Sequence, residues 1–133
     1  MRNPTAHKKI LVVDDEIGIV NIVKLRLEAN NYQVVTAYDG EEALQKVSQE
    51  DPDLIILDLM LPKIDGYMVC SLLKKNSRFE IIPIILFSAR TSPADIALGE
   101  KVGANAYITK PVDMDVLLEK VESLLVTGDG FNE

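Results

Sequence analysis

Polar side chains that could carry out phosphate or metal chemistry follow short apolar runs of the sequence. The runs cover residues 10–13, 34–37, 54–57, 84–87 and 106–108. Acidic, hydroxyl or ammonium groups come directly after four of them, namely Asp14, Asp15, Asp58, Ser88, Thr109 and Lys110. Taken singly, each aspartate is also a common turn or helix-cap residue. Their shared position at the ends of apolar runs is what points to a site.

A cluster of three carboxylates would form if these runs were parallel strands, because the carboxyl ends of parallel strands open onto one edge of the sheet. Two unit charges ~4 Å apart repel by about 4 kcal/mol at an effective dielectric near 20. Such a cluster needs a cation, the ammonium of Lys110 or a raised pKa. Mg²⁺ fits, with Mn²⁺ as a substitute, since both favour oxygen ligands. Zinc and iron do not, because His7 is the single histidine and Cys70 the single cysteine.

The same cluster supplies a nucleophile. An aspartate carboxylate such as that of Asp58 can attack phosphorus and form an aspartyl phosphate. A metal ion would neutralise the repulsion between carboxylate and phosphate, and Lys110 would stabilise the charge on the transferred group. We therefore expect a domain that catalyses its own phosphorylation, and not a metabolic enzyme.

The elements that must position these groups can be inferred from the pattern of apolar residues. Three of the runs are nearly continuous Ile, Val and Leu, which is typical of strands buried on both faces of a parallel sheet. Amphipathic stretches separate the runs, including a stripe of Ile19, Ile22, Val23 and Leu27 and a third helix at about residues 66–75. Helix start and stop signals stand at Asn30, Asn31, Asp39 with Glu42 as its reciprocal partner, Ser92, Pro93, Gly103 and Asp113. The pattern predicts an α/β fold, an open, doubly wound, five-stranded parallel sheet with five flanking helices.

Composition limits the class of protein. A chain of 133 residues, 47% apolar, fits one compact domain, which we place at residues 9–126 between flexible segments 1–8 and 127–133. A formal net charge of −7 argues against direct binding to nucleic acid and suits protein partners. One cysteine forms no internal disulfide, and no apolar run reaches the ~20 residues of a membrane span. With no signal-peptide pattern, we expect a cytoplasmic protein.

Four segments resemble the receiver domains of two-component response regulators. They are residues 10–16 (ILVVDDE), residues 54–66 (LIILDLMLPKIDG), the strand at 83–89, and the pair Lys110 and Pro111. The resemblance covers nearly the whole chain. It implies a flavodoxin-like fold with strand order 2-1-3-4-5, and a switch that is phosphorylated by a histidine kinase or a histidine phosphotransfer protein.

The resemblance also assigns the phosphorylation site. It implies that Asp58 is the phosphoacceptor and also a ligand of Mg²⁺. Asp14 and Asp15 would bind the same ion, Asp15 directly and Asp14 mainly through water. The backbone carbonyl of Met60 would be the third protein ligand.

Further positions match the parts of the family that respond to phosphate. Ser88 and Lys110 match the hydroxyl and the lysine that contact phosphate oxygens, and Tyr107 matches the aromatic switch that moves with the hydroxyl. Pro111 resembles the family's proline that follows a cis peptide bond, which would fix the direction of Lys110. Gly66 resembles the glycine of the loop beneath the site; it is also readable as an ordinary turn glycine, and Tyr107 as an ordinary strand aromatic.

Two positions beside the site bear on the lifetime of the phosphorylated state. In receivers the residues that correspond to Met60 and Arg90 influence how water reaches the phosphate. Since Met60 has no group that positions water, we hypothesise slow self-dephosphorylation. In the family the face built from residues 92–126 serves homodimerisation or docking of an effector or fused output domain.

Three other functions compete with this interpretation. A pseudo-receiver would be a protein-interaction module that signals without phosphorylation, although the set of five site residues is intact. A phosphatase with an aspartate nucleophile usually needs a second acid two residues later, where Met60 stands. A flavodoxin-like cofactor binder would need a phosphate loop, but no glycine-rich loop follows the first run.

Overall fold

The sheet of this protein contains five parallel strands. The computed structural model describes residues 7–127, and its strands are β1 (Lys9–Val13), β2 (Gln33–Ala37), β3 (Leu54–Leu57), β4 (Ile84–Ser88) and β5 (Ala106–Thr109). Their order in the sheet is β2-β1-β3-β4-β5, and every neighbouring pair is parallel. The predicted fold and strand order are confirmed. Each strand matches its apolar run to within one residue at either end. The match is clearest for β1, β3 and β4, whose side chains are buried almost throughout and must therefore be apolar on both faces.

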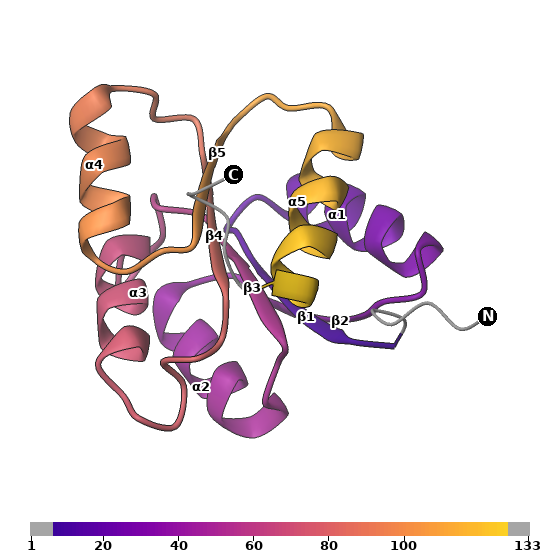
Figure 1. Cartoon of the computed structure of the whole chain (residues 1–133), viewed down its shortest axis with the longest axis horizontal. Coiled ribbons are helices and arrows are strands. Elements are labelled where there is room, and N and C mark those ends of the chain that lie inside the picture. Colours follow the sequence, from indigo (N-terminus) through magenta and orange to yellow (C-terminus); the bar gives the residue numbers. More distant parts are fainter. Residues whose placement is uncertain (1–6, 128–133) are drawn as a thin grey trace.

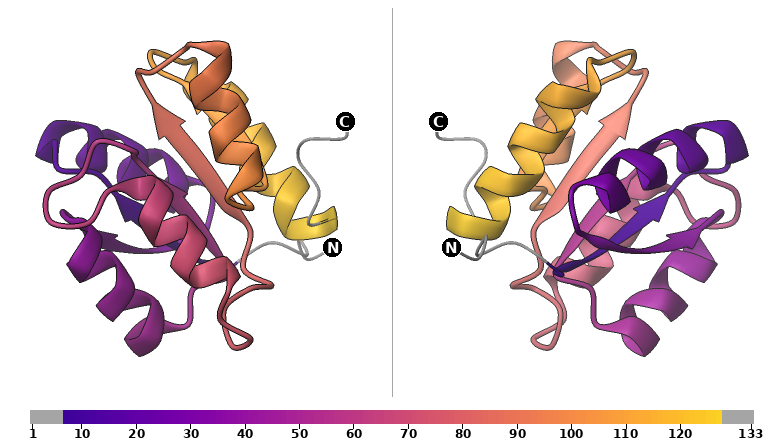
Figure 2. Two further views of the ribbon diagram at one scale, coloured as in Figure 1. Left: turned by 90° about the vertical axis from the view of Figure 1, so that its left-hand side faces the viewer. Right: turned by 90° about the vertical axis from the view of Figure 1, so that its right-hand side faces the viewer.

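Five helices connect the strands and cover both faces of the sheet. They are α1 (Ile17–Ala29), α2 (Gly40–Glu50), α3 (Gly66–Lys74), α4 (Pro93–Lys101) and α5 (Met114–Thr127). Helices α1 and α5 lie on one face, and α2, α3 and α4 lie on the other (Figure 1). Figure 1 shows the sheet between the two helix layers, and the views in Figure 2 look onto the molecule from the side of α3 and α4 and from the side of α1 and α5. This arrangement is the doubly wound architecture that the alternation of strands and helices predicts.

The hydrophobic core has two parts, one on each face of the sheet. Along β1, Leu11 and Val13 belong to the cluster beneath α2 and α3, whereas Ile10 and Val12 belong to the cluster beneath α1 and α5. All four are at most 1% exposed. Successive side chains of a strand point to opposite faces, so a strand between two helix layers must be apolar throughout. The apolar core therefore determines that β1 ends at Val13 and that the polar residues Asp14 and Asp15 follow it.

Helix caps mostly match the sequence signals. Ser92 accepts the backbone N–H of Asp95 through its hydroxyl at 3.1 Å, ahead of Pro93 in the first turn of α4. The carboxylate of Asp39 accepts the N–H of Glu42 at 2.7 Å. The reciprocal bond was predicted one residue out of place, because the carboxylate of Glu42 accepts the N–H of Tyr38, at 2.7 Å, and not that of Asp39. An extended cap residue leaves the preceding N–H within reach of this long side chain.

The predicted inner stripe of α1 was wrong at one position. Val20, Val23 and Leu27 form its buried side, whereas Ile22 is 54% exposed. Adjacent helix positions differ in direction by about 100°, so the side chain of Ile22 points away from the buried side formed by Val20, Val23 and Leu27. Ile22 instead lines a surface pocket beside α5.

The chain ends that we expected to be flexible, residues 1–8 and 127–133, lie mostly outside the described residues. His7 donates its backbone N–H to Asn31 at 2.7 Å, and α5 extends to Thr127. The boundaries of the flexible segments stay a prediction for residues 1–6 and 128–133. Within residues 7–127 no helix combines the length and the apolar character needed to cross a membrane.

Candidate functional site

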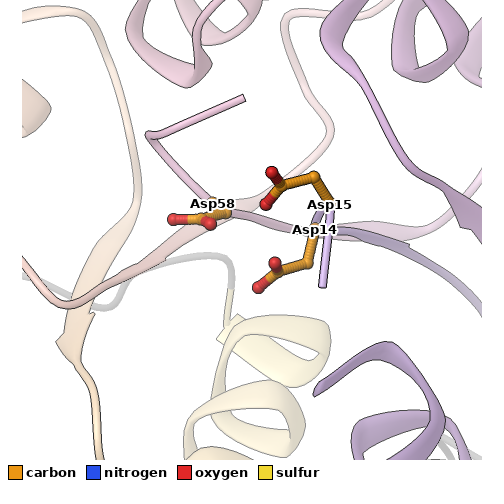
Figure 3. A group of neighbouring side chains, drawn as sticks. All are labelled: Asp14, Asp15 and Asp58. Atoms are coloured by element: carbon orange, nitrogen blue, oxygen red, sulfur yellow. The ribbon is translucent and has the colours of Figure 1, made fainter. Parts of the chain in front are cut away.

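Three carboxylates meet at the carboxyl edge of the sheet. Asp14 and Asp15 follow β1 and Asp58 follows β3, and these two strands are neighbours. One oxygen of each carboxylate lies within 4.8 Å of the others, and Figure 3 shows the three side chains grouped at the strand ends. Asp14 is 2% exposed and Asp58 is 6% exposed, whereas Asp15 is open to solvent. The structure therefore brings together side chains that lie far apart in the sequence.

Lys110 reaches this cluster from the end of β5. Its ammonium nitrogen lies 2.6 Å from Asp14 Oδ2 and 3.5 Å from Asp58 Oδ2. The same nitrogen lies 5.1 Å from the ring centre of Phe87, a buried residue of the core beneath α1 and α5. Burial opposes the charge on Lys110, but the hydrogen bond and charge of Asp14 and the charge of Asp58 outweigh it and raise the pKa of the lysine. Lys110 is thus held in its charged form beside the two buried acids.

The Asp58 carboxyl group is under opposing influences. Burial raises its pKa first of all, and the negative charge of Asp14 raises it further. The ammonium of Lys110 and the backbone N–H groups of Leu59 and Met60 act in the other direction but do not cancel the shift. A bound cation would favour the ionised, nucleophilic form.

Ser88 and Tyr107 lie on the next two strands. Ser88 is fully buried, its carbonyl accepts the N–H of Lys110 at 2.8 Å, and its hydroxyl accepts the N–H of Arg90 at 3.2 Å. Tyr107 is half-buried and donates its hydroxyl to the carbonyl of Arg90 at 2.8 Å. A side-chain carbon at Gly99 of α4 would come within 3.0 Å of the Tyr107 ring. Arg90 thus joins the hydroxyl of β4 to the aromatic ring of β5.

The backbone around Asp58 is tightly packed. A side-chain carbon added at Gly66 would lie 2.2 Å from the carbonyl oxygen of Asp58, so only glycine fits the start of α3 here. Met60 is 56% exposed, and its N–H lies 3.4 Å from Asp58 Oδ1. The peptide bond between Lys110 and Pro111 is cis.

A pocket of about 290 Å³ opens above these groups. Its lining residues are Asp15, Glu16, Asp58, Met60, Ser88, Ala89, Arg90 and Lys110. Sequence reasoning missed Glu16, whose N–H donates to Asp14 Oδ1 at 3.0 Å and orients that carboxylate. It also missed Ala89. Glu16 directly follows Asp15, and Ala89 directly follows Ser88; this adjacency in the sequence was the one signal that could have indicated them. Tyr107, Pro111 and Gly66 support the site from outside this lining.

The donor set suits a hard divalent ion. The three clustered acids offer carboxylate oxygens, two of them largely buried, and the pocket lining contains no histidine or cysteine. Mg²⁺ is commonly held by one or two carboxylates together with phosphate oxygens, and it tolerates the open side that Asp15 faces. Three close negative charges against one ammonium also leave a net charge that a cation would balance.

Comparison with known proteins decides the family. Residues 10–122 match the response regulator receiver domain. The chain belongs to this family. Receiver domains are the phosphorylation-dependent switches of two-component systems, so the family predicted from the four sequence segments is confirmed.

Two curated relatives illustrate the match. The chain is 45% identical over 119 residues to the alkaline phosphatase synthesis transcriptional regulatory protein PhoP of Bacillus subtilis, with 90% of the chain and 49% of the relative covered. It is 40% identical to the DNA-binding dual master transcriptional regulator RpaA of a Synechocystis strain, with 91% and 50% covered. The chain spans about half the length of these relatives.

Solved structures agree with the fold. A putative response regulator from Chloroflexus aurantiacus superimposes with a TM-score of 0.86 at 32% identity, covering 90% of this chain and 98% of that one. The chemotaxis protein CheY4 of Vibrio cholerae gives 0.83 at 34% identity, with 89% and 98% covered. The beryllofluoride-activated receiver domain of RstA from Klebsiella pneumoniae gives 0.83 at 30% identity, with 89% and 98% covered.

Proposed function

We propose that this receiver domain accepts a phosphoryl group on Asp58 with the help of Mg²⁺. The observation that carries the proposal is the buried Asp58 carboxylate at the floor of a pocket, 3.5 Å from the ammonium of Lys110 and close to two further acids. A carboxylate kept for stability alone would not be buried beside like charges. A nucleophile that must meet an anionic donor needs this setting of acids and a cation.

The arrangement supports the following transfer step. An oxygen of Asp58 attacks phosphorus, the bond from phosphorus to the donor nitrogen breaks, and its electron pair stays on the donor imidazole. Bound Mg²⁺ would supply charge neutralisation between the carboxylate and the phosphoryl oxygens. Asp14, Asp15, Asp58 and the carbonyl of Met60 are the groups that would hold the ion. Lys110 and the Ser88 hydroxyl would bind phosphoryl oxygens after transfer.

The switch would act through the face formed by α4, β5 and α5. A phosphoryl group on Asp58 carries about 1.5 to 2 negative charges in place of the single charge of the carboxylate. This larger charge and its three acceptor oxygens bias an equilibrium between two packings of the β4 to α5 region. Ser88 and Tyr107 both contact Arg90 and would move with it. We expect a histidine kinase or a histidine phosphotransfer protein as donor. The downstream partner would be an effector, an output domain or a second copy, in line with the transcriptional regulators PhoP and RpaA.

A phosphodonor assay tests the proposal. The purified chain is incubated with Mg²⁺ and acetyl phosphate, and the intact mass is measured, with Asp58→Asn and Asp51→Asn as matched variants. Asp51 is an exposed residue at the end of α2. A labile phosphoryl adduct is expected for the unmodified chain and for Asp51→Asn, but not for Asp58→Asn. Absence of any adduct on the unmodified chain would favour an interaction module that works without phosphorylation.

A further inference from the structure

Arg90 is contacted from several directions in the loop between β4 and α4. Its backbone N–H donates to the Ser88 hydroxyl, and its carbonyl accepts the Tyr107 hydroxyl. Its side chain donates through Nε to Met60 Sδ at 3.2 Å and places a terminal nitrogen 3.7 Å from Asp95 Oδ1. The guanidinium group therefore lies between the pocket mouth and the first turn of α4.

Asp95 is the fixed member of this ion pair. The Ser92 hydroxyl donates to Asp95 Oδ2 at 2.7 Å, and the Tyr67 hydroxyl of α3 donates to the Asp95 carbonyl at 2.9 Å. Burial, above all, raises the pKa of Tyr67 to about 12, so its hydroxyl keeps its proton and stays a donor. The Asp95 side chain is 22% exposed, whereas the Arg90 side chain is 49% exposed. Arg90 is the partner with room to move.

The charges around the pocket favour a change of partner for Arg90. Arg90, Asp58 and Lys110 line the same pocket of about 290 Å³. A phosphoryl group on Asp58 would carry about 1.5 to 2 negative charges and three acceptor oxygens. Asp95 offers one charge at 3.7 Å, in a pair whose Arg90 side is open to solvent, which makes it a weak competitor. A guanidinium binds phosphate through two parallel hydrogen bonds, which strengthens the preference.

We infer that Arg90 is a second phosphoryl-binding cation, which leaves Asp95 for the phosphoryl group when Asp58 is phosphorylated. The inference rests on the proposed function and extends it to a named ion pair. The exchange removes the guanidinium from the first turn of α4. It also pulls on the loop carbonyl that holds the Tyr107 hydroxyl. Breaking of the ion pair between Arg90 and Asp95 is thereby linked to the movement of the Tyr107 ring.

A double-mutant cycle tests the exchange. Beryllofluoride, a phosphoryl mimic, is titrated into the chain at saturating Mg²⁺, and its affinity is read from amide NMR signals of Ser88 and Lys110. Asp95→Asn should bind beryllofluoride about two- to fivefold more tightly, because Arg90 no longer has to leave an exposed ion pair. Arg90→Ala should bind roughly tenfold more weakly, and Arg90→Lys should recover part of the loss. In the Arg90→Ala background, Asp95→Asn should have no effect.

Controls separate the exchange from a structural role. Saturating Mg²⁺ in every titration keeps differences in Mg²⁺ affinity out of the comparison. Arg78→Ala, at an exposed ion pair with Asp51, should leave beryllofluoride binding unchanged. An affinity gain of Asp95→Asn that persists in the Arg90→Ala background would overturn the exchange, as would unchanged affinities in both single variants. Failure of the unmodified chain to bind beryllofluoride would overturn the proposed function, and the exchange with it.

Discussion

Replacing Asp58 with asparagine should stabilise the protein in the absence of Mg²⁺. At 4.8 Å and an effective dielectric near 20, the carboxylates of Asp58 and the buried Asp14 repel by about 3.5 kcal/mol. The attraction between Asp58 and Lys110 at 3.5 Å amounts to about 4.7 kcal/mol on the same scale. The repulsion from Asp14 cancels most of this attraction, and the exposed Asp15 adds a repulsion that solvent screens. Burial is the largest influence on the Asp58 carboxylate, and together these effects disfavour its charged form by roughly 2 kcal/mol. Asparagine removes the charge and keeps an oxygen that can accept the Met60 N–H.

The expected gain is a rise of about 2 kcal/mol in the free energy of unfolding, or about 6–8 °C in the midpoint of thermal unfolding for a chain of this size. Because burial and Asp14 raise the pKa of Asp58, the folded state binds more protons than the unfolded state between the two pKa values. The stability that Asp58 contributes is therefore full below its unfolded pKa of ~3.9, and it is lost as pH rises through the folded pKa. The advantage of asparagine should be largest near neutral pH and vanish in acid.

Chemical denaturation at several pH values, with and without Mg²⁺, provides the assay. Mg²⁺ that binds only the folded state adds stability to the unmodified chain, so it should narrow the difference from Asp58→Asn. Asp51→Asn is the control, since Asp51 lies in an exposed ion pair and its left-handed backbone suits asparagine. A loss of stability in Asp58→Asn near neutral pH, or a gain that is the same in acid and with Mg²⁺, would refute the electrostatic account of the cluster.

Three further predictions concern single positions of the site. Gly66→Ala should lower the free energy of unfolding, measured by chemical denaturation, by at least about 2 kcal/mol, because its new carbon would lie 2.2 Å from the Asp58 carbonyl oxygen. Gly18→Ala is the control, since Gly18 lies in a helix with open space around it, and it should be neutral or stabilising. Lys110→Met should weaken beryllofluoride binding more than tenfold in NMR titrations, because a charge-assisted contact of about 1.5–3 kcal/mol is lost. Met60→Glu should shorten the phosphoryl lifetime in a phosphate-release assay, because a carboxylate at the pocket mouth can position water.

Each of these predictions has an outcome that contradicts it. Equal stabilities of the Gly66→Ala and Gly18→Ala chains would mean that the start of α3 can move away from Asp58 at no cost. Unchanged beryllofluoride affinity in Lys110→Met would show that the ammonium serves Asp14 alone. A phosphoryl lifetime of seconds in the unmodified chain, unaltered by Met60→Glu, would count against control of water access at this position.

The sheet could be predicted from the sequence because its determinants are local. A strand such as β3, buried on both faces, requires four consecutive apolar residues, and the change to Asp58 marks its end. Parallel strands then place their ends at one edge, so the meeting of Asp14 and Asp58 follows from the topology. Helix ends such as Ser92 and Asp39 were equally predictable, since a cap depends on residues within one turn.

The parts that escaped prediction depend on contacts between separate elements. The ion pair of Arg90 with Asp95 and the bond of Tyr67 to the Asp95 carbonyl join a loop and two helices, whose spacing no local pattern encodes. Gly40 is another case, because a side-chain carbon there would lie 1.9 Å from the carbonyl oxygen of Ile64 in a distant loop. Ile22 matched helical spacing but faces outward, because periodicity fixes the width of an apolar stripe less well than its centre.

The ion pair between Asp14 and Lys110 joins residues that are 96 positions apart, and this has a consequence for biosynthesis. A ribosome makes all three acids long before it makes the lysine that sits among them. A growing chain that has already paired β1 with β3 would hold its carboxylates without their ammonium until residue 110 emerges. Addition of β5 therefore brings the ammonium that balances the buried carboxylates, in addition to its apolar contacts with β4.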